Sequence, residues 1–262
     1  MGYSFNVEKV TKELIEWIRC WFIENGDGCN AVIGISGGKD STIVAKLCVE
    51  ALGADRVIGV MMPCGVQKDI SDSIRVCEYL GIKNYTINIE GAVNATLNQM
   101  KDAGIEISNH TIVNLPPRIR MSTLYAVSQS HNGRVSNNCN LSEDICGFST
   151  RFGDSVGDFS PLSNLTTVEI IQIGDYLGLP YDLVHKVPMD GLNVNENDEY
   201  ITDEDILGVR YSDIHTYARE PHKLMESNIE VFEAIHQKEI KNVFKLKPMP
   251  AYRPLKSLIF KD

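Results

Sequence analysis

The chain has 262 residues, of which 43% are hydrophobic and 23% charged, an ordinary composition for a globular protein with one sizeable core. Its formal net charge of −10 argues against nucleic-acid binding, which usually needs a basic surface. No apolar run approaches the roughly 20 residues that a membrane helix needs, so we expect no membrane association. The seven cysteines contain no C-x-x-C pair, which indicates free thiols in a cytoplasmic protein rather than disulfides or a zinc site.

Strands and helices are expected to alternate along the first part of the chain. Apolar residues at helical spacing predict a helix over 7–25, and the short apolar run 31–35 predicts a buried strand. The elements expected next are a helix at 41–52, a strand at 56–62, a helix at 69–80, a strand at 84–89, a helix near 120–130, a strand at 134–137 and a helix at 167–177. This order predicts an α/β fold, a doubly wound, Rossmann-like parallel sheet with helices on both faces. Ligands of such sheets bind at the carboxyl edge of the strands.

The remaining segments predict irregular structure within a single domain that spans residues 1–262. Residues 139–166 are rich in Gly, Ser, Asp and Asn, a composition typical of functional loops. The acidic stretch 190–205 predicts a mobile surface loop, and the proline-containing tail 245–262 predicts an irregular end.

The segment SGGKDST, residues 36–42, follows the first predicted strand and has the composition of a phosphate-binding loop. Gly37 and Gly38 allow a sharp turn close to a ligand, and the next helix presents free N–H groups to an anion. Lys39 can add positive charge, whereas Asp40 would repel phosphates unless a bridging Mg²⁺ lay between them. The hydroxyl donors of the segment are Ser36, Ser41 and Thr42. The alternative is a simple strand-to-helix turn with a serine cap.

This loop is not a Walker A sequence, because only two glycines precede the lysine. It resembles the pyrophosphatase loop of the N-type ATP pyrophosphatases, whose fold is that of the adenine nucleotide alpha hydrolases. The resemblance implies attack on the α-phosphate of ATP, an adenylated intermediate and release of pyrophosphate.

Three further segments resemble one branch of that superfamily, the ammonia-dependent NAD synthetases. Residues 114–121 (NLPPRIRM) look like the family's N-x-x-x-R-x-R-M segment. Residues 139–165 look like its N-x-S-E-x-x-x-G-x-x-T-[KR]-[YF]-G-D and D-x-x-P-L-x-x-L segments, and 202–211 like its late D-E-x-x-L-G-x-x-Y segment. The resemblance covers residues 7–252 in the family's order.

The resemblance implies that deamido-NAD, ATP and ammonia are converted to NAD, AMP and pyrophosphate through an acyl-adenylate. The chain starts about 35 residues before the phosphate loop, which leaves no room for a glutaminase domain, so we expect free ammonia as the nitrogen donor. The family also implies a homodimer.

Roles for individual residues follow from the matched motifs. Asp40 and Glu143 would be Mg²⁺ ligands, Lys39 would act on the phosphates, and Asp154 would take a proton from ammonium. The residues that match positions contacting deamido-NAD are Arg118, Arg120, Arg151, Asp158 and Lys245. Guanidinium groups suit bidentate contact with phosphate.

The expected ATP contacts include three positions at which the chain departs from the family pattern. Thr167 stands where a lysine is expected, Met189 where Ser or Thr is usual, and Asn138 where Thr is common. Phe244 replaces a frequent histidine, and Lys186 is a candidate replacement for the missing lysine. The departures leave two alternatives open, a related ATP-pyrophosphatase ligase that acts on another carboxylate and an inactive nucleotide-binding homologue.

Overall fold

The computed structural model describes residues 2–67, 70–188 and 201–252. In these ranges the strands form one parallel sheet in the order β3-β2-β1-β4. The strands are β1 (Asn30–Gly34), β2 (Val57–Met61), β3 (Lys83–Thr86) and β4 (Gly133–Val135). The predicted α/β fold with a parallel sheet is confirmed, although β3 ends earlier than the predicted strand 84–89.

The pairing of β1 with the edge strand β4 explains where a site can form. β1 pairs with β4 in parallel register, with Val32 opposite Val135, so both strands end at the same edge of the sheet. The loop that begins at Ser36 follows β1, and the chain leaving β4 continues through Ser136, which bridges to Phe159. Two segments about a hundred residues apart in sequence therefore emerge together at the carboxyl edge.

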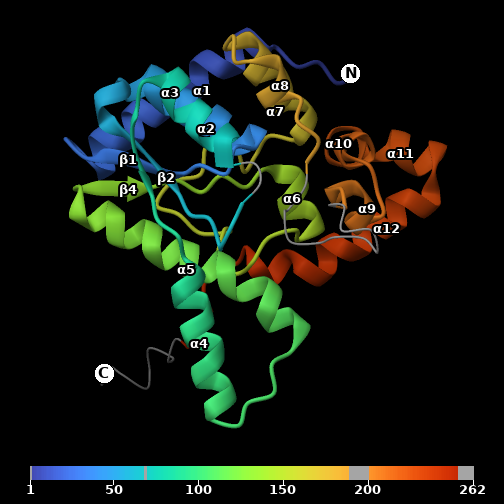
Figure 1. Cartoon of the computed structure of the whole chain (residues 1–262). Helices are drawn as coiled ribbons and strands as arrows, with labels where there is room; N and C mark the ends of the chain where they lie inside the picture. The colour runs from blue at the N-terminus through green and yellow to red at the C-terminus, as the bar shows by residue number, and fades with distance from the viewer. Residues whose placement is uncertain (1, 68–69, 189–200, 253–262) are drawn as a thin grey trace, which may run out of the picture.

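Helices cover both faces of the sheet (Figure 1). Ala31 and Ile33 of β1 point into the larger core, whereas Val32 points into a smaller core on the opposite face, as the two-residue period of a strand requires. The helices of the larger core are α1 (Val7–Asn25), α2 (Lys39–Leu52), α3 (Ile70–Leu80), α7 (Thr167–Tyr176) and α8 (Tyr181–Val184). The helix of the smaller core is α5 (Asn109–Ser130), and the short 3-10 turn η1 (Ala54–Arg56) precedes β2.

A third apolar cluster joins the helices of the C-terminal part to a short helix that follows β4 (Figure 1). Its centre contains Ile214 and Ile235, both fully buried. The helices are α6 (Leu141–Cys146), α9 (Asp203–Leu207), α10 (Tyr211–Arg219), α11 (Pro221–Ser227) and α12 (Ile229–Asn242), followed by η2 (Val243–Lys245). A partly buried ion pair between Arg219 of α10 and Glu169 of α7 (Nη2–Oε2 2.7 Å) links this cluster to the helices that cover the sheet.

Helix α4 (Glu90–Asp102) and the first half of α5 project from the body as a helical arm (Figure 1). α5 begins eleven residues before the helix predicted near 120–130 and runs through Pro116 and Pro117. Proline lacks the N–H that a helix interior normally uses, which is why the sequence pattern favoured a later start.

Two expected loops contain helices. α6 lies within the segment 139–166, and α9 occupies the end of the predicted acidic loop 190–205. Residues 190–200 of that loop and 253–262 of the predicted irregular tail lie outside the described residues. Within the described ranges no helix has the length and apolarity needed to cross a membrane.

Candidate active site

The phosphate loop forms a tight turn at the carboxyl edge of β1. Gly37 has a φ of +78°, and a Cβ atom there would lie 2.9 Å from the Cβ of Asp72, so only glycine fits. The hydroxyl groups of Ser36 and Ser41 lie 3.1 Å apart, and Ser36 Oγ also accepts a hydrogen bond from Gly38 N. Gly38 is the N-cap residue of α2 and supplies no side-chain cap, so the N–H groups of the first helical turn could bind an anion.

The second segment at this edge is the amino end of α6. Asn140 caps α6: its side-chain oxygen accepts hydrogen bonds from the N–H groups of Ser142 (2.9 Å) and Glu143 (3.2 Å). The Glu143 carboxylate accepts a hydrogen bond from the backbone N–H of Asn140 (3.1 Å), which completes a capping box. The amide of Asn140 then reaches across to α2 and donates to Asp40 Oδ1 (3.0 Å).

The sequence-predicted metal ligands Asp40 and Glu143 are thus brought together by one residue. Burial raises the pKa of Glu143 well above its usual value, and the negative charge of Asp40 raises it further. Two carboxylates hydrogen-bonded to the same residue in a partly buried site favour a bound cation, and their oxygens are the ligands that Mg²⁺ prefers.

Among the described residues no group of three or more His, Cys, Asp and Glu side chains could hold a metal. A Mg²⁺ site of one or two carboxylates completed by substrate phosphates and water needs no such group. The residues present therefore fit a Mg²⁺ ion that arrives with ATP.

Lys39 lies beneath the loop rather than on it. Its side chain is only 4% exposed, and its ammonium nitrogen lies 3.0 Å from Asp40 Oδ2 and 5.5 Å from the ring centre of Tyr211. Burial alone would lower the pKa of Lys39, but the charges of Asp40, Glu143 and Asp203 give a net increase. The lysine stays protonated and offsets part of the negative charge of this cluster.

Four basic side chains expected at the substrate site lie on neighbouring segments. Arg118 Nε donates to the backbone oxygen of Arg151 (3.3 Å), and the Arg151 guanidinium lies over the rings of Phe152 and Phe244. Lys245 Nζ, from the other end of the chain, donates to the backbone oxygens of Gly147 (2.7 Å) and Ser149 (3.3 Å). Arg120 Nε donates to the backbone oxygen of Met62 (3.0 Å) at the end of β2.

Asp154 lies among these cations. Its Oδ1 accepts a hydrogen bond from Thr150 N (2.7 Å), and the charges of Arg120 and Lys245 act on it. Its pKa is raised, chiefly because the surrounding protein displaces water from the carboxylate, although the residue as a whole is exposed. Asp158, unlike Asp154, is fixed by the sheet: its Oδ2 accepts a hydrogen bond from Val135 N (2.7 Å) at the end of β4.

The structure places the residues that depart from the family pattern in different parts of the site. Thr167 is 2% exposed, and its hydroxyl donates to Asn140 Oδ1 (3.3 Å), so it is part of the support beneath Asp40. Asn138 Nδ2 donates to the backbone oxygen of Gly34 (3.0 Å), which joins β4 to β1. Lys186 Nζ lies 2.6 Å from Asp72 Oδ2, beside Gly37, whereas Met189 lies outside the described residues.

The sequence motifs include Asn140, Asp203 and Tyr211, but sequence reasoning assigned none of them a role in the site. Tyr211 donates from its hydroxyl to Asp203 Oδ2 (3.3 Å) and places its ring beside Lys39. No spacing rule predicts that contact. The capping role of Asn140 could have been predicted, because a capping residue followed three positions later by Glu143 is a recognised helix-start pattern.

Comparisons with known proteins agree with this geometry. Residues 10–253 match the family model described as NAD synthase. The chain is 36% identical over 208 residues to the NH(3)-dependent NAD(+) synthetase of Thermococcus sibiricus, which covers 79% of this chain and 78% of the relative.

Solved structures agree as well. The structure of NMN synthetase from Francisella tularensis superposes with a TM-score of 0.82 and 28% identity, over 95% of this chain and 99% of the other. The NH3-dependent NAD synthetase from Campylobacter jejuni gives a TM-score of 0.78 and 25% identity, over 96% and 100%. The family model covers most of the chain, and the chain belongs to the NAD synthase family.

Proposed function

We propose that the protein is an ammonia-dependent ligase that uses ATP to convert deamido-NAD to NAD, with AMP and pyrophosphate as the other products. The observation that carries the proposal is the meeting of Asp40 and Glu143 at the amino end of α2, where both are hydrogen-bonded to Asn140. A protein that binds a nucleotide without catalysing a reaction would not need two carboxylates beside the phosphates. Relatives named as NH(3)-dependent NAD(+) synthetases, the first at 36% identity, support ammonia as the nitrogen donor.

The first half-reaction joins the substrate carboxylate to the α-phosphate of ATP. The N–H groups at the start of α2 and the hydroxyls of Ser36, Ser41 and Thr42 would hold the departing pyrophosphate. Asp40 and Glu143 would hold Mg²⁺, which when bound offsets negative charge on the phosphates. No serine or cysteine nucleophile is needed, because the substrate carboxylate itself attacks.

The second half-reaction needs neutral ammonia. Asp154 would accept a proton from ammonium, and its raised pKa makes it a better proton acceptor than an ordinary aspartate. Arg118, Arg120, Arg151 and Lys245 would bind the phosphates and orient the substrate, since they form a local basic group in a protein of net charge −10. Asp158 would contact the substrate from the end of β4.

We propose ATP contacts at three positions that match the family's nucleotide site. Asn138 lies at the carboxyl edge beside Gly34 and can contact a nucleotide there. Thr167 is buried, so we propose that it acts through Asn140 rather than directly. Met189 lies outside the described residues.

A second candidate function is amidation of the mononucleotide, which would give NMN instead of NAD. The superposition with the Francisella tularensis NMN synthetase favours it, at a TM-score of 0.82 against 0.78 for the Campylobacter jejuni enzyme. Both reactions activate the same pyridine carboxylate with ATP. They differ only in whether the substrate carries an adenylate half.

The test is a competition between the two substrates. Purified protein receives ATP, Mg²⁺ and ammonium with either deamido-NAD or nicotinate mononucleotide, and NAD, NMN, AMP and pyrophosphate are quantified. We expect kcat/KM to be higher for deamido-NAD, with one AMP and one pyrophosphate per NAD. A preference for the mononucleotide would establish the second candidate, and no amide product from either substrate would reject both.

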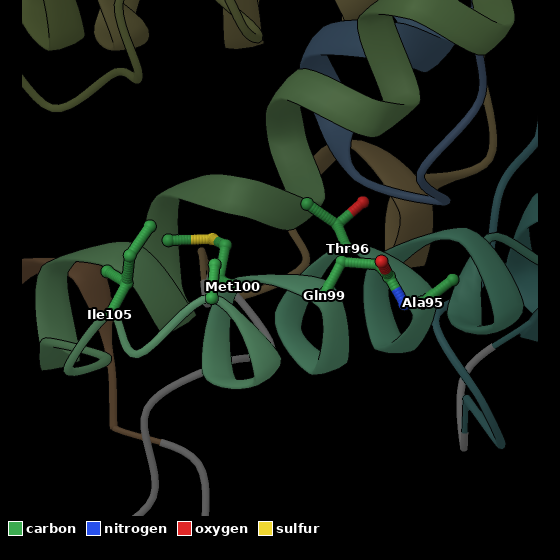
Figure 2. A pocket seen from close by; sticks show the side chains of 6 residues that line it. Ala95, Thr96, Gln99, Met100 and Ile105 are labelled. Carbon is green, nitrogen blue, oxygen red and sulfur yellow. The ribbon is translucent and has the colours of Figure 1, made fainter.

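We also propose that the protein acts in the cytoplasm as a homodimer and that residues 1–262 form one catalytic domain. The helical arm offers a surface for the second copy, because Ile105, Ile112 and Val113 are 50%, 51% and 37% exposed. Figure 2 shows Thr96, Gln99 and Met100 along α4, with Ile105 beyond its end. These side chains line a shallow hollow of about 470 Å³ that lies on the arm and not at the phosphate loop.

A further inference from the structure

We infer that Asn140 is a positioning residue for catalysis: its capped amide fixes the Asp40 carboxylate in the orientation that receives the metal and ATP. The inference rests on the proposed function, since Asp40 and Glu143 matter only if Mg²⁺ and ATP bind there. It concerns a residue that contacts neither substrate and acts through the two carboxylates.

The direction of the Asn140 amide is fixed by its partners. The N–H groups of Ser142 and Glu143 can only donate, so the atom that faces them must be the amide oxygen. The Thr167 hydroxyl donates to the same oxygen. The NH₂ group is therefore left facing Asp40, and it lies 3.0 Å from Oδ1.

Asp40 is consequently held from two sides. Asn140 Nδ2 donates to one carboxylate oxygen, and Lys39 Nζ lies 3.0 Å from the other. Asn140 is fully buried and Asp40 is 19% exposed, so the carboxylate is held from within and remains open on one side. Rotation of this carboxylate would break two charge-assisted hydrogen bonds in a partly buried site.

The same residue also sets the position of Glu143. The backbone N–H of Asn140 donates to Glu143 Oε2 (3.1 Å) within the capping box. One residue at the start of α6 thus determines the distance between two candidate metal ligands that are 103 residues apart in the chain. Thr167 supports it from α7, which gives the position a function without the lysine expected there.

The test is Asn140→Ser. Serine keeps the cap, because Ser and Asn are comparable N-cap residues, but it is too short to reach Asp40. We expect the Mg²⁺ concentration for half-maximal velocity to rise about tenfold, as for other residues that orient metal ligands, while KM for deamido-NAD stays nearly constant. The matched control is Asn228→Ser, because Asn228 is an exposed cap of α12 that accepts from Val231 N (3.2 Å). We expect it to leave the Mg²⁺ dependence unchanged.

A binding measurement separates this inference from the proposed function. Calorimetry with Mg²⁺ and α,β-methylene-ATP, which cannot release pyrophosphate, needs neither deamido-NAD nor turnover. We expect Asn140→Ser to weaken this complex about tenfold without changing the unfolding temperature by more than the control does. Unchanged binding and Mg²⁺ dependence in the folded variant would overturn the inference, even if the enzyme makes NAD.

Asn140→Asp is the second variant if the serine protein does not fold. It keeps the shape and the cap but places a carboxylate against Asp40, so no hydrogen can bridge the two groups unless a proton binds. We expect kcat to fall at least about tenfold. Wild-type kcat and Mg²⁺ dependence in that variant would also contradict the inference.

Discussion

Lys39 and Asp40 are adjacent in the chain and also form an ion pair beneath the phosphate loop, with Nζ 3.0 Å from Oδ2. Because the lysine is 4% exposed, it cannot reach far into solution. The loop therefore carries an internal positive charge that faces Asp40, Glu143 and Asp203. In its absence the three carboxylates would face each other with no cation until substrates arrived.

Replacement of Lys39 by methionine should therefore destabilise the protein when no ligand is bound. We expect the free energy of unfolding to fall by about 3 kcal/mol, because removal of one partner leaves buried carboxylates without compensation. Urea unfolding followed by circular dichroism measures the change. Lys12→Met is the control, since Lys12 pairs with Glu8 at the surface of α1, and it should leave the midpoint unchanged. A Lys39→Met protein as stable as the wild type would contradict the buried position of this charge.

Asp40→Asn should keep the fold and remove most of the activity. The amide retains the shape of the side chain but loses the charge that would bind Mg²⁺. We expect pyrophosphate release to fall at least about a hundredfold, within the range for loss of a preorganised electrostatic group. Turnover is measured with a pyrophosphate assay and folding with circular dichroism. Near-normal turnover in the folded variant would exclude a metal-binding role for Asp40.

The Arg219–Glu169 pair should make stability depend on pH. Burial tends to raise the pKa of Glu169, but hydrogen bonds from Arg219, Thr166 N and Tyr3 more than offset it and leave the pKa lowered. A lowered pKa in the folded state adds stability above the ordinary pKa of 4.5, and that stability is lost as pH falls through the lower value.

Arg219→Met should make ionisation of Glu169 destabilise the folded protein instead of stabilising it. Without the guanidinium, burial dominates and the pKa of Glu169 rises above its ordinary value. We expect the variant to be less stable by about 2 kcal/mol at pH 7, with the difference shrinking towards pH 4. Arg75→Met, which breaks an exposed pair with Asp182 (2.6 Å), is the control. A difference that does not vary with pH would show that Glu169 is not the group responsible.

The sheet and its first helices could be predicted from local patterns. The helix expected at 7–25 agrees with α1, and the apolar run before the glycines marked β1. α4 was missed because it buries little: Val93 is its one buried side chain, so the segment has no continuous apolar stripe at helical spacing. The early part of α5 was missed because of Pro116 and Pro117. α9, α10 and α11 are short, and together with α12 they are stabilised by packing on each other around Ile214 and Ile235.

In the candidate site, too, local segments could be predicted from the sequence and contacts between distant segments could not. The phosphate loop is continuous in sequence, so its glycines and its following helix predicted its form. The contact between Tyr211 and Lys39 depends on how α10 packs against α2, and the contact between Asn140 and Asp40 depends on the adjacency of β1 and β4. Such contacts between distant segments follow from the fold and leave no local signal in the sequence.

The helical arm gives a prediction about assembly. Ile112→Glu places a charge in the apolar surface that we propose a second copy covers. We expect sedimentation equilibrium to give a dimer mass for the wild type and a monomer mass for the variant at the same concentration, because burying an unpaired charge is unfavourable. Ile23→Glu, at a 70% exposed position of α1, is the control. A wild-type monomer that is fully active would reject the homodimer.

The central claim is that the loop at Ser36 activates a carboxylate at the α-phosphate of ATP, and transfer of an oxygen isotope tests it most directly. Deamido-NAD labelled with ¹⁸O in its carboxylate is turned over with ATP, Mg²⁺ and ammonium, and the AMP is analysed by mass spectrometry. The acyl-adenylate route predicts that each AMP carries one ¹⁸O from the carboxylate, while the NAD amide keeps the other. Unlabelled AMP, or ADP and phosphate in place of AMP and pyrophosphate, would contradict it.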